Sequence, residues 1–186
     1  MKNKITSNLK LQSYQKIPKT PFPINEILKI GNLKLNMKIF PSENENIANL
    51  LYVPGYGENC EMNAHVFQQL AKSNISTYAV DRRGFGSNSN LPGHIKGQIS
   101  NQTGLVTDVL AQIEHIRSLL PNKPLYLYGY SLGGLINNYL MYANKISSRE
   151  IQGLISYAPA FQFNPHFTNE EIDQLRFHVE NGNPTK

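Results

Sequence analysis

Short apolar runs alternate with helical patterns along most of the chain, and this alternation restricts the fold more than any other feature. From Gly104 to Leu120, apolar residues recur every three or four positions, as they do along one face of an amphipathic helix. We predict strands at 33–40, 47–53, 76–80, 125–130 and 154–158, and helices at 62–72, 104–120 and 132–143. Such an order is typical of β-α-β units. We therefore expect an α/β fold with a mostly parallel sheet and helices on both faces.

The positive charge of the chain is concentrated at its start. Residues 1–38 contain eight lysines and one acidic residue, net +7, whereas residues 39–186 contain ten basic and twelve acidic residues, net −2. Residues 1–30 also hold Pro18, Pro21 and Pro23, which predict a basic, polar and partly disordered lead-in. This segment lacks the aromatic interleaving of nucleic-acid-binding proteins, so we expect no nucleic-acid partner. Peripheral contact with an anionic membrane surface is the alternative to a simple solvated arm.

The composition excludes several classes of protein. The single cysteine, Cys60, cannot form an internal disulfide, and we interpret it as a structural residue. No apolar run approaches the roughly 20 residues needed to span a bilayer, and the N-terminus lacks the apolar core of a secretory signal, so we expect a cytoplasmic protein. No residues have metal-ligand spacing, and Gly84-x-Gly86 lacks the third glycine of a dinucleotide fingerprint. We expect neither a metal nor a cofactor.

The sharpest chemical signal is the sequence Gly129-Tyr130-Ser131-Leu132-Gly133. It follows a predicted strand and opens a predicted helix, which is where a serine nucleophile sits on a strained turn. The glycines at 129 and 133 allow the backbone to turn there without clashes. We predict Ser131 as a catalytic nucleophile; the structural alternative is a serine that merely caps a glycine-rich helix start.

A second motif supports the first. Acyl transfer passes through a tetrahedral oxyanion, which needs preorganised hydrogen-bond donors. One donor is expected from the backbone N–H of the residue after the nucleophile, Leu132. The other is expected from the loop Pro54-Gly55-Tyr56-Gly57, which follows an earlier strand, and we predict the N–H of Tyr56 for this role. The alternative is that this loop is simply a turn.

Residues 50–160, approximately, resemble the monoacylglycerol-lipase and lysophospholipase branch of the α/β hydrolases, also described as serine aminopeptidase S33-like. Three stretches carry the resemblance: VPGYGE from Val53, DRRGFGSN from Asp81, and the helix, serine turn and strand of residues 105–161. Two positions depart from that family's pattern. Pro54 replaces the usual histidine of the oxyanion loop, and Asn88 stands at the usual serine position.

The resemblance also implies a catalytic acid and then a histidine, on strands that follow the serine. Only 55 residues follow Ser131, and they contain one aspartate, Asp173, and two histidines, His166 and His178. Asp173 and His178 share one predicted helix at a spacing that points them about 140° apart. We therefore expect residues 31–161 to be an incomplete α/β-hydrolase core that lacks the last strands, with 162–186 the start of a cap or a disordered tail.

The resemblance implies a serine hydrolase of carboxylic esters of lipid-like alcohols, of the monoacylglycerol or lysophospholipid type, acting through a Ser131 acyl-enzyme. Without an acid and a histidine, we expect the chain alone to be weakly active or inactive. Three alternatives stay open: a non-catalytic module that binds an acyl ligand or a partner, a fragment of an S33-type peptidase, and a chain whose exposed sheet edge prevents stable folding alone.

Overall fold

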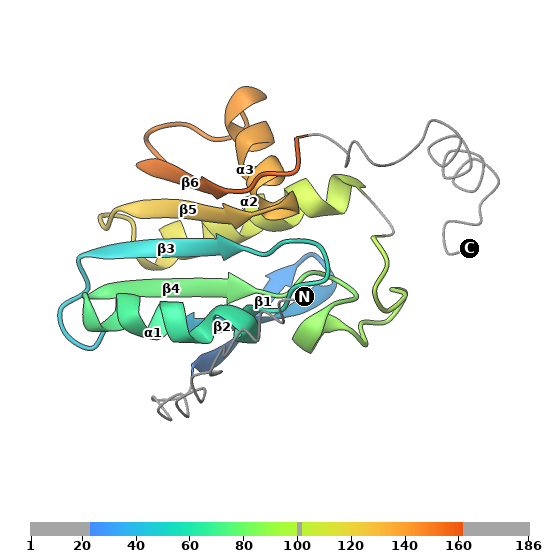
Figure 1. Cartoon of the computed structure of the whole chain (residues 1–186), viewed down its shortest axis with the longest axis horizontal. Helices are drawn as coiled ribbons and strands as arrows, with labels where there is room; N and C mark the ends of the chain where they lie inside the picture. The colour runs from blue at the N-terminus through green and yellow to red at the C-terminus, as the bar shows by residue number, and fades with distance from the viewer. Residues whose placement is uncertain (1–22, 100–101, 162–186) are drawn as a thin grey trace, which may run out of the picture.

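The computed structural model describes residues 23–99 and 102–161. Within them, six strands form one sheet in the order β1-β2-β4-β3-β5-β6 (Figure 1). The strands are β1 (Ile24–Ile30), β2 (Leu33–Phe40), β3 (Ala48–Val53), β4 (Ile75–Val80), β5 (Leu125–Tyr130) and β6 (Gly153–Tyr157). The helices are α1 (Ala64–Lys72), α2 (Gln102–Leu119) and α3 (Leu132–Tyr142), with short 3-10 helices η1 (Cys60–Asn63) and η2 (Gly86–Asn88).

The sheet is parallel from β4 through β3 and β5 to β6, and β1 and β2 add an antiparallel edge. A helix separates each pair of successive parallel strands along the chain. β3 is buried along almost its whole length, as expected for a central strand that is covered on both faces. The mostly parallel α/β sheet predicted from the sequence is therefore confirmed.

Helices cover both faces of the sheet (Figure 1). On one face, apolar residues of α2 and α3 join the larger core cluster, among them Val109, Ile113 and Leu140. On the other face, Phe67 of α1 is fully buried between Phe40 and Tyr52, with ring centroids 5.1 and 5.0 Å away. These two layers hold β3 and β5 rigidly, and both strands end at the edge of the sheet where the predicted site lies.

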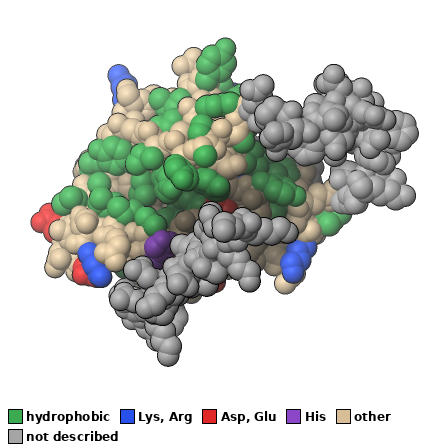
Figure 2. Space-filling view, in the orientation of Figure 1, with side chains coloured by type: hydrophobic (Ala, Val, Ile, Leu, Met, Phe, Trp, Pro, Cys, Tyr) green, Lys and Arg blue, Asp and Glu red, His purple; other side chains and the backbone are tan. Residues whose placement is uncertain are grey.

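The face that carries α1 is only partly covered. α1 packs against β4 and β2, while α3 packs against β5 and β6 from the opposite side. Tyr126 of β5 is 36% exposed, and Ile155 and Tyr157 of β6 are 52% and 62% exposed. Figure 2 shows hydrophobic side chains gathered over the molecule in this view. Within the described residues, β6 is thus an edge strand with an open aromatic face.

The structure corrects one predicted boundary. The sequence placed residues 1–30 in a polar lead-in, but Ile24–Ile30 forms β1, which pairs along its whole length with β2. The apolar residues Ile24, Ile27, Leu28 and Ile30 do not alternate regularly with polar ones, and only Leu28 is buried, so the sequence lacks the period-2 pattern by which a strand is recognised. The observed helices and other strands start or end within two residues of the predicted ones. The predicted lead-in before Pro23, the tail 162–186, Asp173, His166 and His178 lie outside the described residues.

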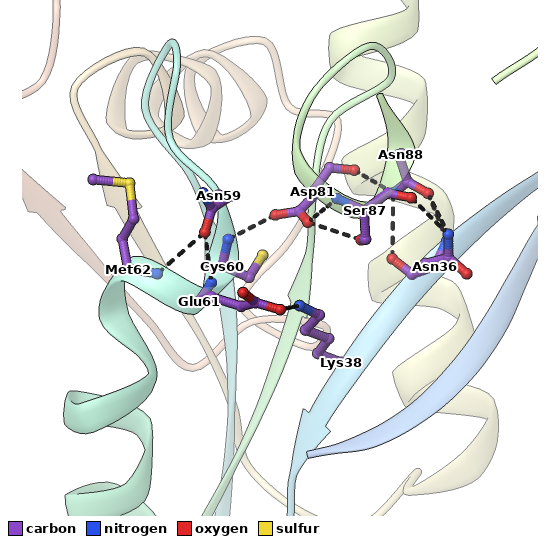
Figure 3. A network of polar contacts seen from close by, with 9 residues as sticks. All are labelled: Asn36, Lys38, Asn59, Cys60, Glu61, Met62, Asp81, Ser87 and Asn88. Carbon is purple, nitrogen blue, oxygen red and sulfur yellow. Dashed lines mark hydrogen bonds and ion pairs between the residues drawn. The ribbon is translucent and has the colours of Figure 1, made fainter. Parts of the chain in front are cut away.

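A polar network fixes the loop that follows β4 (Figure 3). Asp81 accepts hydrogen bonds from the N–H of Cys60 at 2.6 Å and from the N–H and hydroxyl of Ser87 at 2.7 and 2.8 Å. Asn88 is 1% exposed; its Nδ2 donates to Asp81 O and its Oδ1 accepts from Asn36 N–H at 2.8 Å. The amide of Asn88 therefore ties this loop to β2.

Candidate active site

Ser131 occupies the turn between β5 and α3. Its backbone lies at φ 50° and ψ −115°, a region that residues other than glycine rarely adopt. The surrounding backbone holds this conformation: Ser131 N–H donates to Tyr157 O at 3.0 Å, and Ser131 O accepts from Leu135 N–H and Ala160 N–H. A strained serine at the N-terminus of a helix is the geometry that the Gly-x-Ser-x-Gly sequence predicts.

The two flanking glycines lie where the backbone segments approach most closely. A Cβ atom on Gly133 would lie 1.9 Å from Val53 O, and one on Gly129 would lie 2.6 Å from Gly133 O. Side chains of any size are excluded at both positions, because these neighbours are backbone atoms that cannot rotate away. The glycines therefore allow the first turn of α3 to pack directly onto the end of β3.

The loop 54–57 lies beside this turn. β3 and β5 are parallel neighbours with Val53 opposite Gly129, so the loop and Ser131 emerge at the same edge of the sheet. A Cβ atom on Gly55 would lie 2.8 Å from the ring of Tyr130. Two segments about 75 residues apart in the chain are thus packed against each other at this edge of the sheet.

Two backbone donors at this edge are unpaired. Across residues 23–99 and 102–161, no acceptor is hydrogen-bonded to the N–H of Tyr56 or to the N–H of Leu132. The side chain of Tyr56 is turned away, with its hydroxyl donating to Gly97 O at 3.0 Å and its ring edge-on to Phe85. The positive end of the α3 dipole lies at the same point, and it favours negative charge there.

The histidines of the described segments are elsewhere. His65 is exposed on α1, and His94 lies in the loop after η2. His115 of α2 has Nε2 2.9 Å from Glu26 Oε1 of β1, the strand at the far edge of the sheet from β6. The Ser131 hydroxyl has no hydrogen bond to any side chain of the described residues. Among the described residues, no histidine is therefore hydrogen-bonded to Ser131.

A pocket lined with aromatic residues opens next to the loop. It is bounded by Tyr52, Tyr56, Gly57, Glu58, Met62, Asn63, Tyr128, Tyr130 and Tyr157. The rings of Tyr130 and Tyr157 stack with centroids 5.5 Å apart. Such a surface suits apolar or flat ligand groups, with the carboxylate and amide of Glu58 and Asn63 as its polar part.

Sequence reasoning assigned no role to Glu58 or Arg82, although both touch the loop directly. The Glu58 carboxylate accepts the N–H of Gly55 at 2.5 Å, and the Arg82 guanidinium donates to Gly55 O at 3.0 Å. A charged residue beside each glycine-rich motif was visible in the sequence. The contact itself was not, because Arg82 is 27 residues from Gly55 and reaches it only through the pairing of β4 with β3.

Cys60 is fully buried, with a thiol whose pKa is raised well above its ordinary value by burial and by the neighbouring Asp81. A protonated, enclosed thiol is a poor nucleophile, which agrees with the structural role predicted for it. None of the described helices has the length and apolarity that crossing a membrane requires. In the same part of the chain, no three His, Cys, Asp or Glu residues gather as a metal site would need.

Comparison with known proteins gives consistent matches. The family model described as serine aminopeptidase, S33, matches residues 44–179. The monoglyceride lipase of Saccharomyces cerevisiae is 28% identical over 135 residues, which are 71% of this chain and 42% of that protein. A crystal structure of a soluble variant of that lipase with a substrate analog superposes with TM-score 0.71 and 24% identity, over 89% of this chain and 54% of that one.

A second solved structure, a thermostable carboxyl esterase from Bacillus coagulans with glycerol, superposes with TM-score 0.65 and 18% identity, over 88% of this chain and 52% of that one. The chain thus spans about half the length, or less, of the relatives it matches.

Proposed function

The chain belongs to the serine aminopeptidase S33 family of α/β hydrolases, and from this premise we propose that it contributes the nucleophile and the oxyanion site for hydrolysis of carboxylic esters. The observation that carries the proposal is the strained Ser131 at the start of α3, beside two backbone N–H groups that have no acceptor among the described residues. A helix-capping serine needs neither the strain nor the second donor on a separate loop.

In the proposed reaction, Ser131 Oγ attacks the ester carbonyl carbon while a base accepts the hydroxyl proton. The carbonyl π electrons move to oxygen, and the N–H groups of Tyr56 and Leu132 stabilise the resulting oxyanion. Collapse of the tetrahedral intermediate expels the alcohol, which receives the proton from the conjugate acid of the base and leaves an acyl group on Ser131. Attack by water repeats the sequence and releases the carboxylic acid.

We propose a lipid-like ester as the substrate, of the monoacylglycerol or lysophospholipid type. Two observations support this choice: the similarity to monoglyceride lipases, and the aromatic pocket between Tyr128, Tyr157 and the loop 54–57. An apolar acyl or glyceryl group would bury its surface against these rings.

The first test compares ester hydrolysis by the wild-type chain, Ser131→Ala and the matched control Ser118→Ala, whose serine is exposed on α2. Ser131→Ala is expected to reduce protein-dependent turnover of short and medium acyl esters to background, while Ser118→Ala retains the wild-type rate. The same panel includes aminoacyl anilides. Ser131-dependent cleavage of anilides in preference to esters would assign a peptidase activity instead, and ester turnover that is above background and equal in all three proteins would refute the proposal.

A non-catalytic role in binding an acyl ligand is the second candidate. It is favoured by the absence of any imidazole hydrogen-bonded to Ser131 within residues 23–99 and 102–161. A protein of this kind would bind a non-hydrolysable alkyl glyceryl ether and release no product from the corresponding ester. Under the proposed hydrolase function, the same ether inhibits a measurable, Ser131-dependent turnover.

A further inference from the structure

Arg82 binds two successive carbonyl groups of the loop after β3. Its Nη1 donates to Gly55 O at 3.0 Å, and its Nη2 donates to Pro54 O. Arg82 is the second residue after β4, the strand next to β3, so its side chain reaches across from a neighbouring strand end. The guanidinium group is well suited to this contact, because its planar donors can hold two acceptors in a fixed relation.

Glu58 holds the same loop by accepting the N–H of Gly55. Oε2 accepts the Gly55 N–H at 2.5 Å and the Tyr52 hydroxyl at 2.7 Å, and Asn63 Nδ2 donates to the Tyr52 hydroxyl oxygen at 2.8 Å. Burial, and then the hydrogen bond from Tyr52 to Glu58, raise the pKa of Tyr52. The phenol therefore stays protonated and keeps donating to the carboxylate, which fixes the position of Glu58.

These contacts set the orientation of two successive peptide units. The unit between Pro54 and Gly55 is bound at both ends, by Arg82 at its oxygen and by Glu58 at its N–H. In the unit between Gly55 and Tyr56, the oxygen accepts from Arg82 at 3.0 Å and, more weakly, from the N–H of Glu58 at 3.4 Å. A trans peptide is planar, with its N–H directed opposite to its C=O. Arg82 makes the shorter of the two hydrogen bonds to Gly55 O and so helps to set the direction of the Tyr56 N–H, which has no acceptor among the described residues.

The charge of Arg82 adds to the effect of its position. Burial lowers the pKa of Arg82 to about 10, with Glu58 acting in the opposite direction, so the guanidinium is still a cation near neutral pH. A cation bound to the oxygen of Gly55 polarises the peptide unit and strengthens its N–H as a donor.

We propose that Arg82 and Glu58 are positioning residues for the hydrolytic reaction: together they clamp the loop 54–57 and aim the Tyr56 N–H at the oxyanion. The proposal rests on the function proposed above for Tyr56 and Ser131. In this role, each side chain acts through the backbone of the loop.

The test uses the full chain and the variants Arg82→Met, Arg82→Lys and Glu58→Gln, with Arg83→Met as the matched control. Arg83 is also a partly buried arginine, but its guanidinium pairs with Asp108 and makes no hydrogen bond to the loop. Circular dichroism first establishes that each variant is folded. Two readouts follow: hydrogen exchange of the Gly55 amide, and the rate at which a fluorophosphonate modifies Ser131.

Arg82→Met is expected to accelerate exchange of the Gly55 amide about tenfold or more, because the loop loses two of its anchors. It should slow modification of Ser131 by about 10- to 100-fold. The complete loss of an oxyanion donor slows a reaction by about 100- to 1000-fold, and a misdirected donor should cost no more than that. Arg82→Lys should lie between Arg82→Met and wild type, Glu58→Gln should change both readouts in the same direction as Arg82→Met, and Arg83→Met should leave both within about twofold of wild type.

Unchanged Gly55 exchange in folded Arg82→Met would overturn the clamp, whatever the reactivity of Ser131. Faster exchange with an unchanged rate of Ser131 modification would overturn its role in the reaction. If the wild-type chain is not modified at Ser131 at all, the proposed function fails first, and the exchange of Gly55 still decides whether the clamp exists.

Discussion

Replacement of Gly133 by alanine is expected to destabilise the chain by about 3 kcal/mol or more, or to prevent its folding. The added Cβ would lie 1.9 Å from Val53 O, 2.7 Å from Val53 C and 2.8 Å from Pro54 O. All three are backbone atoms of the central strand and the loop that follows it. Relief of the clash requires α3 to move away from β3, and this movement separates Ser131 from the loop 54–57.

Gly104→Ala is the matched control, because it places the same methyl group near the start of another helix. The nearest atom to that Cβ is the guanidinium carbon of Arg83 at 3.6 Å, an ordinary contact. Since alanine favours a helix over glycine, this variant should be as stable as wild type or up to about 1 kcal/mol more stable. Urea unfolding measures both variants, and equal stability of Gly133→Ala and Gly104→Ala would refute the close packing of α3 on β3.

Ester turnover by the 186-residue chain is expected to be at least about 10³-fold slower than that of a full-length relative in the same assay. A serine hydroxyl without a base is a weak nucleophile, and the oxyanion site with binding alone leaves about 10³- to 10⁴-fold acceleration over water. The described residues supply no imidazole that is hydrogen-bonded to Ser131. Under the proposed function, a base and its orienting acid would have to come from residues outside 23–99 and 102–161.

His178→Ala and His166→Ala test whether the tail of this chain provides that base. The predicted helix places Asp173 and His178 on diverging faces, so we expect each substitution to change the residual turnover by less than about threefold. Turnover comparable to that of the full-length relative, and lost in both Ser131→Ala and His178→Ala, would show that His178 is a working base.

Much of the sheet could be predicted because its information is local. Strands such as 125–130 and helices such as 104–120 have apolar periods that survive in the structure almost unchanged, and the turn at Ser131 follows from the glycines around it. β1 could not be predicted, because a strand that buries only Leu28 on an edge needs no alternating pattern. β1 is positioned largely by backbone hydrogen bonds to β2, and backbone groups carry little information about the sequence.

The sequence predicted which loops of the candidate site lie together, but not the side chains that hold those loops in place. The sequence order of strand, glycine-rich loop and serine turn was enough to bring Tyr56 and Leu132 to the same edge as Ser131. The contacts of Arg82 and Glu58 depend on side-chain directions at two strand ends that meet only after β3 and β4 have paired. The sequence predicted an exposed edge of the sheet but not the open aromatic face of β5 and β6. In β5, Tyr126 and Tyr128 alternate with the buried Leu125 and Leu127, and only the structure shows that no helix covers the tyrosine side within the described residues.

The most direct test of the central claim is to identify the residue that an ester-mimicking reagent modifies. The wild-type chain, Ser131→Ala and Ser118→Ala are incubated with a fluorophosphonate for several hours, and the adduct is located by peptide mass spectrometry. We expect one phosphonyl group on Ser131 in the wild type and in Ser118→Ala, and none in Ser131→Ala. No adduct on the wild-type chain, an adduct on another residue, or equal modification of Ser131→Ala would contradict the central claim.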